Sequence, residues 1–167
     1  MISPEEAVAV ALDVARAGLD SGEMPIGAVV FSGDAFLASA YTQEQKQGRR
    51  IVHADLLAME EADRALGFTR RDETLTLAVN LEPCLMCLGA AITLGVDRVV
   101  YSLESPNDGA VELLAAWNPP VEQSFFRRPA HVAGGILREE SKALFRHYAQ
   151  GEGPKGMRTW AASLAQG

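Results

Sequence analysis

The sequence predicts an α/β domain in which a mixed β-sheet lies between two layers of helices. Two observations carry this prediction: two strand-like segments near the N-terminus form a predicted hairpin, and strands then alternate with helices. The length of 167 residues is that of one ordinary domain. A hydrophobic content of 48% allows a sizeable core and excludes a disordered or fibrous chain.

The N-terminal segment predicts a helix followed by a β-hairpin. Ser3-Pro4-Glu5-Glu6 combines an N-cap, a proline in the first turn and a capping-box glutamate, so a helix begins here and ends near residues 18–22. Residues 25–31 and 35–41 are strand-like segments on either side of the turn-forming Ser32-Gly33-Asp34. We expect these two strands to pair.

The middle of the chain predicts a helix, a strand and a second helix. The polar stretch 42–50 is expected to be a loop. Over residues 53–66 apolar side chains recur at roughly helical spacing, and Gly67 is a suitable C-terminal stop. A buried strand is predicted over 75–79, and a helix introduced by a proline over 84–94.

The last third of the chain is less regular. We predict a strand over 97–101, a short helix over 110–117 and an amphipathic helix over 137–150. The segment 117–130 contains three prolines and is expected to be irregular. This order of elements indicates a three-layer domain without fixing its topology.

The chain divides into a functional domain, residues 1–150, and a C-terminal tail, residues 151–167. Glycines and a proline over 151–156 predict a flexible break before a short stretch around Trp160. Such a tail is most simply a frayed or surface-docked end. A lid over the protein's own pocket or a neighbour's, or a dimer contact, is the alternative, because active-site closure excludes water.

Charge and composition limit the partners and the compartment. The formal net charge is −7, which disfavours long-range attraction to nucleic acid or to an anionic membrane. No apolar run approaches the length of a membrane span, so we expect no membrane association. Two closely spaced cysteines are too few for a disulfide scaffold and suggest thiolate or metal chemistry in a reducing compartment, the cytoplasm.

Two short motifs point to a metal site. His53-Ala54-Asp55 and Pro83-Cys84-Leu85-Met86-Cys87 each lie at the start of a predicted helix. The two cysteines are three residues apart on one helix face, where the helix dipole stabilises thiolates. With the histidine they give three protein ligands and leave a fourth tetrahedral position for water, the pattern of catalytic zinc.

Asp55 is the predicted proton shuttle of this site. Zinc makes water available as a nucleophile near neutral pH, and such chemistry needs a group that moves protons. The carboxylate two residues after the histidine can lie beside the metal without binding it. It could pass a proton to a ring nitrogen and to leaving ammonia, so the motifs predict hydrolytic deamination.

The motifs together resemble the cytidine-deaminase-like superfamily, particularly the branch of bacterial tRNA adenosine deaminases and guanine deaminases. The resemblance extends over about residues 5–150 and is specific as a set. It is carried by Glu23-Met-Pro-Ile-Gly-Ala-Val-Val30, Val52-His-Ala-Asp-Leu-Leu-Ala58, Leu81-Glu-Pro-Cys-Leu-Met-Cys-Leu-Gly-Ala90 and Arg98-Val-Val-Tyr101.

The resemblance implies a fold and a set of site residues. The family fold is a central five-stranded sheet with helices on both faces, commonly in dimers or larger assemblies, so we expect a homodimer. His53, Cys84 and Cys87 match the zinc ligands. By the same resemblance, Ala54 offers backbone contacts to the substrate and Pro83 lies beside its flat ring.

The chain departs from the family pattern at Asp55, where the family has glutamate. The shorter side chain withdraws the carboxylate by about one C–C bond, and a misplacement of about 1 Å can cost roughly 10²-fold in rate, so we predict a slow enzyme. Aspartate is either native, with a slightly shifted backbone, or an engineered replacement. Because the rest of the signature is intact, we favour replacement.

A second departure concerns the substrate. Relatives in this branch carry an Asn-Arg pair after the hairpin, whereas this chain has Ala40-Tyr41-Thr42-Gln43-Glu44-Gln45. With the negative net charge, this weakens the case for tRNA, whose binding normally requires lysine and arginine. We therefore predict a small nucleobase, nucleoside or nucleobase-like heterocycle as substrate. A tRNA-editing adenosine deaminase and a catalytically silent, zinc-stabilised binding module are the alternatives.

Other chemistry-bearing residues have simpler interpretations. The cysteine pair alone could be a redox dithiol, but the upstream histidine makes zinc the better interpretation. His131 and His147 are not accompanied by a similar motif and are expected to be structural or exposed. Phe125-Phe126-Arg127-Arg128 could stack on single-stranded nucleic acid, although packing with a solvated rim is favoured. Trp117 is either core or pocket wall.

Overall fold

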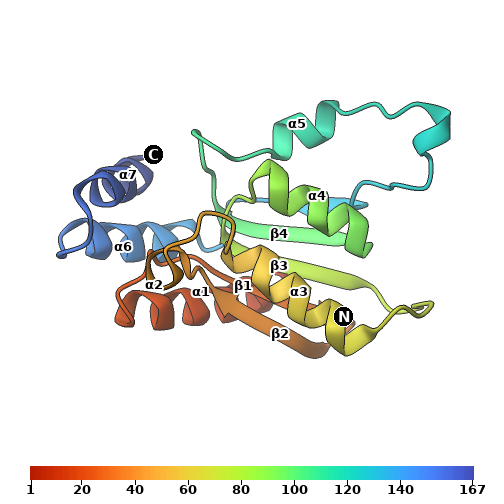
Figure 1. Ribbon diagram of the computed structural model, residues 1–167, viewed down its shortest axis with the longest axis horizontal. Coiled ribbons are helices and arrows are strands. Elements are labelled where there is room, and N and C mark those ends of the chain that lie inside the picture. The colour runs from red at the N-terminus through yellow and green to blue at the C-terminus, as the bar shows by residue number, and fades with distance from the viewer.

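The computed structural model describes residues 1–167 and has the expected α/β/α architecture, with a five-stranded sheet between helices (Figure 1). The strands are β1 (Gly27–Ser32), β2 (Ala35–Tyr41), β3 (Leu75–Leu81), β4 (Arg98–Leu103) and β5 (His131–Ala133). The helices are α1 (Pro4–Asp20), α2 (Glu44–Gln47), α3 (Ala54–Leu66), α4 (Leu85–Leu94), α5 (Val111–Ala116), α6 (Arg138–Ala149) and α7 (Lys155–Gln166), with a 3-10 turn, η1 (Val121–Gln123). None of these helices combines the length and hydropathy needed to cross a membrane.

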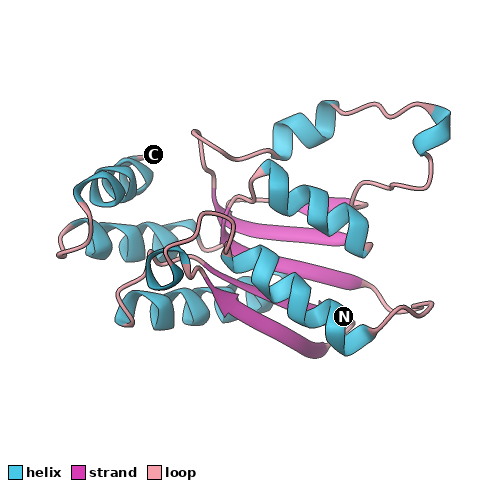
Figure 2. Cartoon of the chain, in the orientation of Figure 1, coloured by secondary structure: helices cyan, strands magenta, loops and turns pink.

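The sheet is mixed, as predicted. Its strand order is β2-β1-β3-β4-β5. The strands are coloured magenta in Figure 2. β1 is antiparallel to both β2 and β3, whereas β3, β4 and β5 run parallel to one another. The predicted hairpin is confirmed, and Gly33 in its turn has φ +59°, a conformation that glycine adopts readily. Because β3 and β4 are parallel, their carboxyl ends meet at one edge of the sheet.

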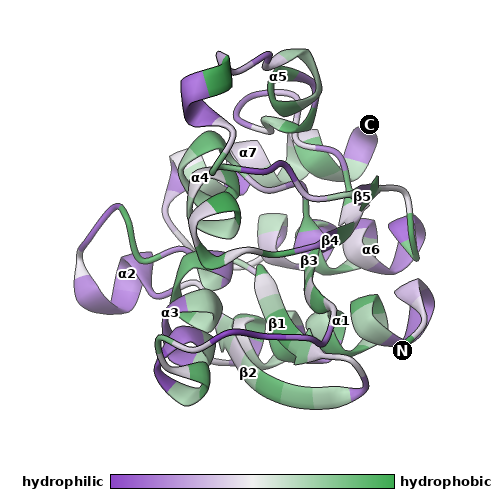
Figure 3. Ribbon diagram, turned by 90° about the vertical axis from the view of Figure 1, so that its right-hand side faces the viewer, coloured by the Kyte–Doolittle hydropathy of each residue, from purple (hydrophilic) through white to green (hydrophobic).

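Two cores lie on opposite faces of the sheet. Successive residues of β1 alternate between them: Ala28 and Val30 pack towards α3 and α4, and Val29 and Phe31 pack towards α1 and α6. Figure 3 shows the two helical layers on either side of the strands. The sheet is therefore covered on both faces, which explains why every residue of β3 is buried.

Two short elements of the structure differ from the expectation. The stretch 42–50, predicted as a loop, contains the short helix α2, because the buried carboxylate of Glu23 accepts hydrogen bonds from the backbone of Gln45 (3.2 Å) and Lys46 (2.6 Å). This tertiary contact is invisible to local propensity. The three-residue strand β5 was not anticipated from the residues, since it is too short to show a pattern.

The tail is a packed helix rather than a frayed end. Helix α7 lies against α6 and buries Ala161 and Leu164 in a third cluster that includes Phe145 and Met24. The glycine-rich break is present, but the chain resumes helical structure directly after Pro154. The residues beyond 150 are thus part of the folded structure.

Two buried contacts fix the start of β1 close to the site. A Cβ on Gly27 would lie 2.4 Å from the backbone nitrogen of Ala15 in α1, so only glycine allows this approach of helix and strand. The Asn80 side chain in β3 accepts the Gly27 N–H (2.8 Å) and donates to the Pro25 carbonyl (2.8 Å). Asn80 also donates to Ser141 of α6, so one side chain joins three elements.

Gly27→Ala should therefore destabilise the protein by about 3 kcal/mol, through overpacking against a backbone that has no flexible end to move. The matched control is Gly89→Ala in α4, where an added Cβ meets nothing within 4 Å. That change should stabilise the helix by up to about 1 kcal/mol. Urea denaturation measures both, and equal stability of the two variants would contradict this account of α1 packing.

Candidate active site

Two helix starts form the site. His53 is the N-cap residue of α3 and Cys84 is the N-cap residue of α4, both with extended backbone. Helix α4 follows β3 directly, and α3 packs beside it on the same face of the sheet. The N-termini of the two helices therefore converge near the carboxyl end of β3, the edge where α/β folds commonly place ligands.

Three donor atoms meet between these helix starts. His53 Nδ1 lies 3.5 Å from Cys84 Sγ and 3.8 Å from Cys87 Sγ. All three atoms lie within 4.8 Å of one another. Tetrahedral zinc with ordinary Zn–N and Zn–S bonds requires donor separations of roughly 3.6 to 3.8 Å. The three residues thus fit zinc in both donor chemistry and spacing.

Asp55 lies beside this triad rather than within it. Its side chain is buried, and its Oδ1 accepts hydrogen bonds from Cys87 Sγ (2.8 Å) and from the backbone of Leu56 (3.2 Å). Burial raises the pKa of this carboxyl group, because an anion loses solvation in a desolvated site. A carboxylate that is buried next to metal ligands and has a raised pKa is suited to receiving and returning protons.

The two thiols differ in their electrostatics. The neighbouring thiol of Cys87 lowers the pKa of Cys84 to about 4, whereas the Cys84 sulfur and burial both raise the pKa of Cys87. A hydrogen bond to Cys84 raises the pKa of His53 to about 9, against the opposing effect of burial. Cys84 is consequently an anionic donor already favoured by its surroundings.

A small pocket opens over these residues. It has a volume of about 160 Å³, which suits a single heterocycle better than a large ligand. Its walls combine apolar side chains from the sheet with four carboxylates and contain no lysine or arginine. The lining residues are Ile26, Thr42, Glu44, His53, Ala54, Asp55, Val79, Leu81, Glu82, Cys84, Asp108 and Trp160.

Glu82 attaches the loop after β4 to the site. Its carboxylate accepts the backbone N–H groups of Ser105 (3.0 Å) and Val111 (3.4 Å). The backbone of Cys84 also pairs with Gly109, where a side chain would collide with Glu82. This loop brings Asp108 to the pocket wall.

The predicted site residues are brought together with one exception. His53, Ala54, Asp55 and Cys84 line the pocket, and the buried Cys87 completes the triad beneath it. Pro83 is buried and does not line the pocket; its carbonyl instead accepts the Ala110 N–H at 3.0 Å. Its contact with a substrate ring stays a prediction.

Four polar residues of the pocket wall were not predicted as site residues. Thr42 and Glu44 come from the stretch expected to be a loop, and Glu82 and Asp108 flank or follow buried strands. Their positions depend on long-range contacts, so no local spacing signals them. Trp160 lines the same pocket from α7.

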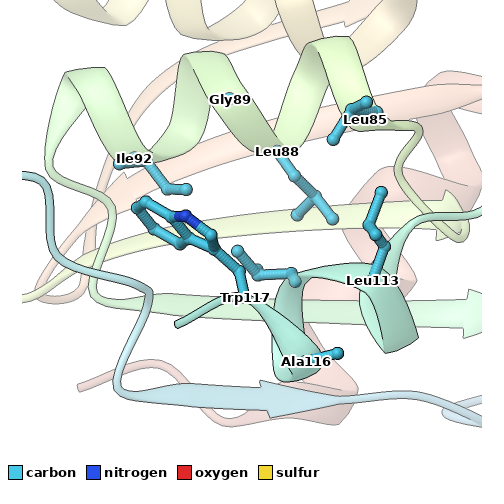
Figure 4. Close-up of a pocket in the computed structure, with 8 residues that line it drawn as sticks. Leu85, Leu88, Gly89, Ile92, Leu113, Ala116 and Trp117 are labelled. Carbon is cyan, nitrogen blue, oxygen red and sulfur yellow. The ribbon is translucent and has the colours of Figure 1, made fainter. Parts of the chain in front are cut away.

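The remaining sequence candidates lie elsewhere. His131 and His147 are exposed, in agreement with expectation. Phe125 and Phe126 contact each other edge to face but are 90% and 46% exposed, so their expected packing is wrong. Trp117 is a pocket wall, in an apolar groove between α4 and α5 (Figure 4).

Comparison with known proteins agrees with this geometry. Residues 1–103 match the family model of the cytidine and deoxycytidylate deaminase zinc-binding region, and the chain belongs to this family. The tRNA-specific adenosine deaminase of Bacillus subtilis (strain 168) is 37% identical over 130 residues, which cover 78% of each chain. That of Aquifex aeolicus is 31% identical, covering 81% of this chain and 91% of its own.

Solved structures give the same fold. A structure from a study of A-to-I editing by tRNA A34 deaminases has a TM-score of 0.68 and 28% identity, covering 83% of this chain and 97% of the other. A guanine deaminase from Nitrosomonas europaea has a TM-score of 0.71 and 26% identity, covering 89% and 85%. The chain is thus a zinc-dependent deaminase, and zinc is its cofactor.

The chemistry divides between the metal and the chain. Zinc, when bound, supplies water that is activated near neutral pH. His53, Cys84 and Cys87 would hold it, and their positions are set by helix starts that are fixed to the sheet. The chain itself places the Asp55 carboxylate beside the ligand set, in the wall of the same small pocket.

Replacement of a ligand should remove zinc without unfolding the chain. In His53→Asn the new side chain is a good N-cap, so α3 should form, but zinc affinity should fall by at least about 100-fold. His147→Asn, at an exposed position of α6, is the matched control and should keep about one zinc ion per chain. Metal analysis with chelator competition measures both, and unchanged affinity in His53→Asn would refute the assigned ligand set.

Proposed function

We propose that the protein removes an exocyclic amino group from a small nucleobase, nucleoside or nucleobase-like heterocycle by hydrolysis, with release of ammonia. The observation that carries this proposal is the small pocket in which Asp55 lies beside the His53–Cys84–Cys87 triad. Asp55 takes the role of proton shuttle. The backbone of Ala54 and the ring of Pro83 contact the substrate in this proposal, by resemblance to relatives.

The position of Asp55 supports a slow reaction. Its carboxylate is directed at Cys87 Sγ, and the short side chain keeps it close to the helix start. A glutamate at the same position would extend by one methylene further into the pocket. The reduced reach accounts for the predicted low rate.

Asp55→Glu should increase the rate of ammonia release by about 10²-fold. The measurement uses zinc-loaded protein and a panel of free bases, nucleosides and a tRNA anticodon stem-loop. Asp55→Asn is the control, and it should keep zinc while losing activity. If Asp55→Glu is no faster than the parent chain, the predicted rate penalty is wrong. If both are silent with zinc bound, the binding-module alternative gains support.

A second candidate is editing of adenosine in tRNA. The names of the Bacillus and Aquifex relatives favour it. Against it stand the net charge of −7 and a pocket wall without lysine or arginine. A filter-binding salt titration with tRNA separates the candidates: we expect weak binding, whereas tight binding with a steep salt dependence would favour the RNA substrate.

The tail and the assembly belong to the same proposal. Trp160 of α7 forms part of the pocket wall, which supports a role of the tail as a lid. The apolar groove of about 380 Å³ between α4 and α5, edged by the exposed Leu85 and Leu113, supports a homodimer (Figure 4). The unpaired cysteines fit the cytoplasm.

A further inference from the structure

We propose that Glu44 is a specificity-determining residue that selects substrates with an N–H donor edge or a positive charge and rejects phosphorylated ones. The inference rests on the proposed function, because it assigns a substrate class to the same pocket. It starts from the pocket wall, where four carboxylates face the cavity and His53 is the one basic side chain, with no lysine or arginine beside it.

Three of these carboxylates already accept hydrogen bonds from other groups of the protein. Glu82 holds the backbone of the loop after β4. Asp55 accepts the Cys87 thiol, and Asp108 accepts the Ser105 hydroxyl. Glu44 differs, because its Oε1 accepts only the Thr42 hydroxyl (3.0 Å) and its Oε2 has no partner. Acceptor capacity at Glu44 is therefore left for a ligand.

Glu44 is close to the reacting end of the pocket. Its Oε1 lies 3.9 Å from His53 Nε2, on the side of the imidazole ring opposite the cysteines. Its side chain is 34% exposed, so it is partly shielded from water. Glu44, His53 and Cys84 line the same pocket, so a ligand bound beside the metal ligands lies close to this carboxylate.

The position of Glu44 is held by long-range contacts. The buried Glu23 accepts two backbone N–H groups of α2, and Gln45 donates to the Tyr148 hydroxyl of α6 (2.9 Å). Helix α2 is thereby attached both to the start of the hairpin and to the opposite helical layer. A carboxylate fixed in this way is preorganised for a ligand, so little entropy is lost when it binds.

The chemistry of a fixed carboxylate defines the ligand. Amino groups and ring N–H groups donate charge-assisted hydrogen bonds to it, which are stronger than neutral ones. A phosphate meets like charge at short range in a partly desolvated wall with no lysine or arginine. An amino-substituted, unphosphorylated heterocycle satisfies both conditions.

The test compares the full zinc-loaded chain with Glu44→Gln, which keeps the shape and removes the charge. The control is Glu60→Gln, at a side chain that is 55% exposed on α3 and paired with Arg64. Calorimetry measures binding of 2,6-diaminopurine against purine, and of adenosine against adenosine 5′-monophosphate. Ligands are recovered and checked for deamination, and zinc affinity is measured in parallel.

The parent chain and Glu60→Gln should prefer the diamino and the unphosphorylated ligand by about 10- to 100-fold. Glu44→Gln should lose most of both preferences while retaining zinc. Unchanged preferences in Glu44→Gln would overturn the proposal. A loss of zinc with unchanged preferences would overturn it too, and would assign Glu44 to positioning His53. Absence of ammonia from every ligand would refute the proposed function, whereas the binding preferences would still test Glu44.

Discussion

The three zinc donors meet because two helices begin at neighbouring points of one sheet edge. His53 and Cys84 are both N-cap residues, so each side chain leaves the chain at the point where a backbone turns from extended to helical. The parallel pair β3 and β4 determines where α4 begins. The packing of α3 beside α4 determines where α3 begins relative to α4. Any shift of one helix along the sheet would separate the imidazole from the thiols. The chemistry of the site depends on this one geometric constraint.

Buried and half-buried polar side chains maintain that constraint. Asn80 ties the start of β1 to β3 and α6, Glu82 ties the loop after β4 to the start of α4, and Glu23 ties α2 to the hairpin. Each satisfies backbone groups that helices and strands leave unpaired. No buried polar side-chain atom in the structure lacks a partner. These three residues explain how segments far apart in sequence form one small pocket.

The predictable parts of the molecule are those encoded locally. The capping box at Ser3, the turn at Gly33 and the spacing of Cys84 and Cys87 are short-range signals, and the structure has the predicted helix, hairpin and helix face. The zinc set could be predicted because His53 and the cysteines occur in motifs whose chemistry is specific. The central strands followed from continuous apolar runs.

The parts that sequence reasoning missed depend on tertiary contacts. Helix α2 exists where a buried glutamate accepts its first N–H groups, and α7 is helical where Ala161 and Leu164 meet the third core cluster. Strand β5 is paired by its neighbour rather than by its own propensity. The pocket residues Glu44 and Asp108 lie on segments that long-range contacts position. Their place in the pocket could therefore be inferred only from the assembled fold.

The central claim is an open zinc site made by one histidine and two cysteines of this chain. X-ray absorption spectroscopy of the zinc-loaded protein tests it most directly. We predict one imidazole nitrogen and two sulfur ligands, with the remaining ligand a light atom that no side chain supplies. A fourth protein ligand, or a spectrum without sulfur, would contradict the account.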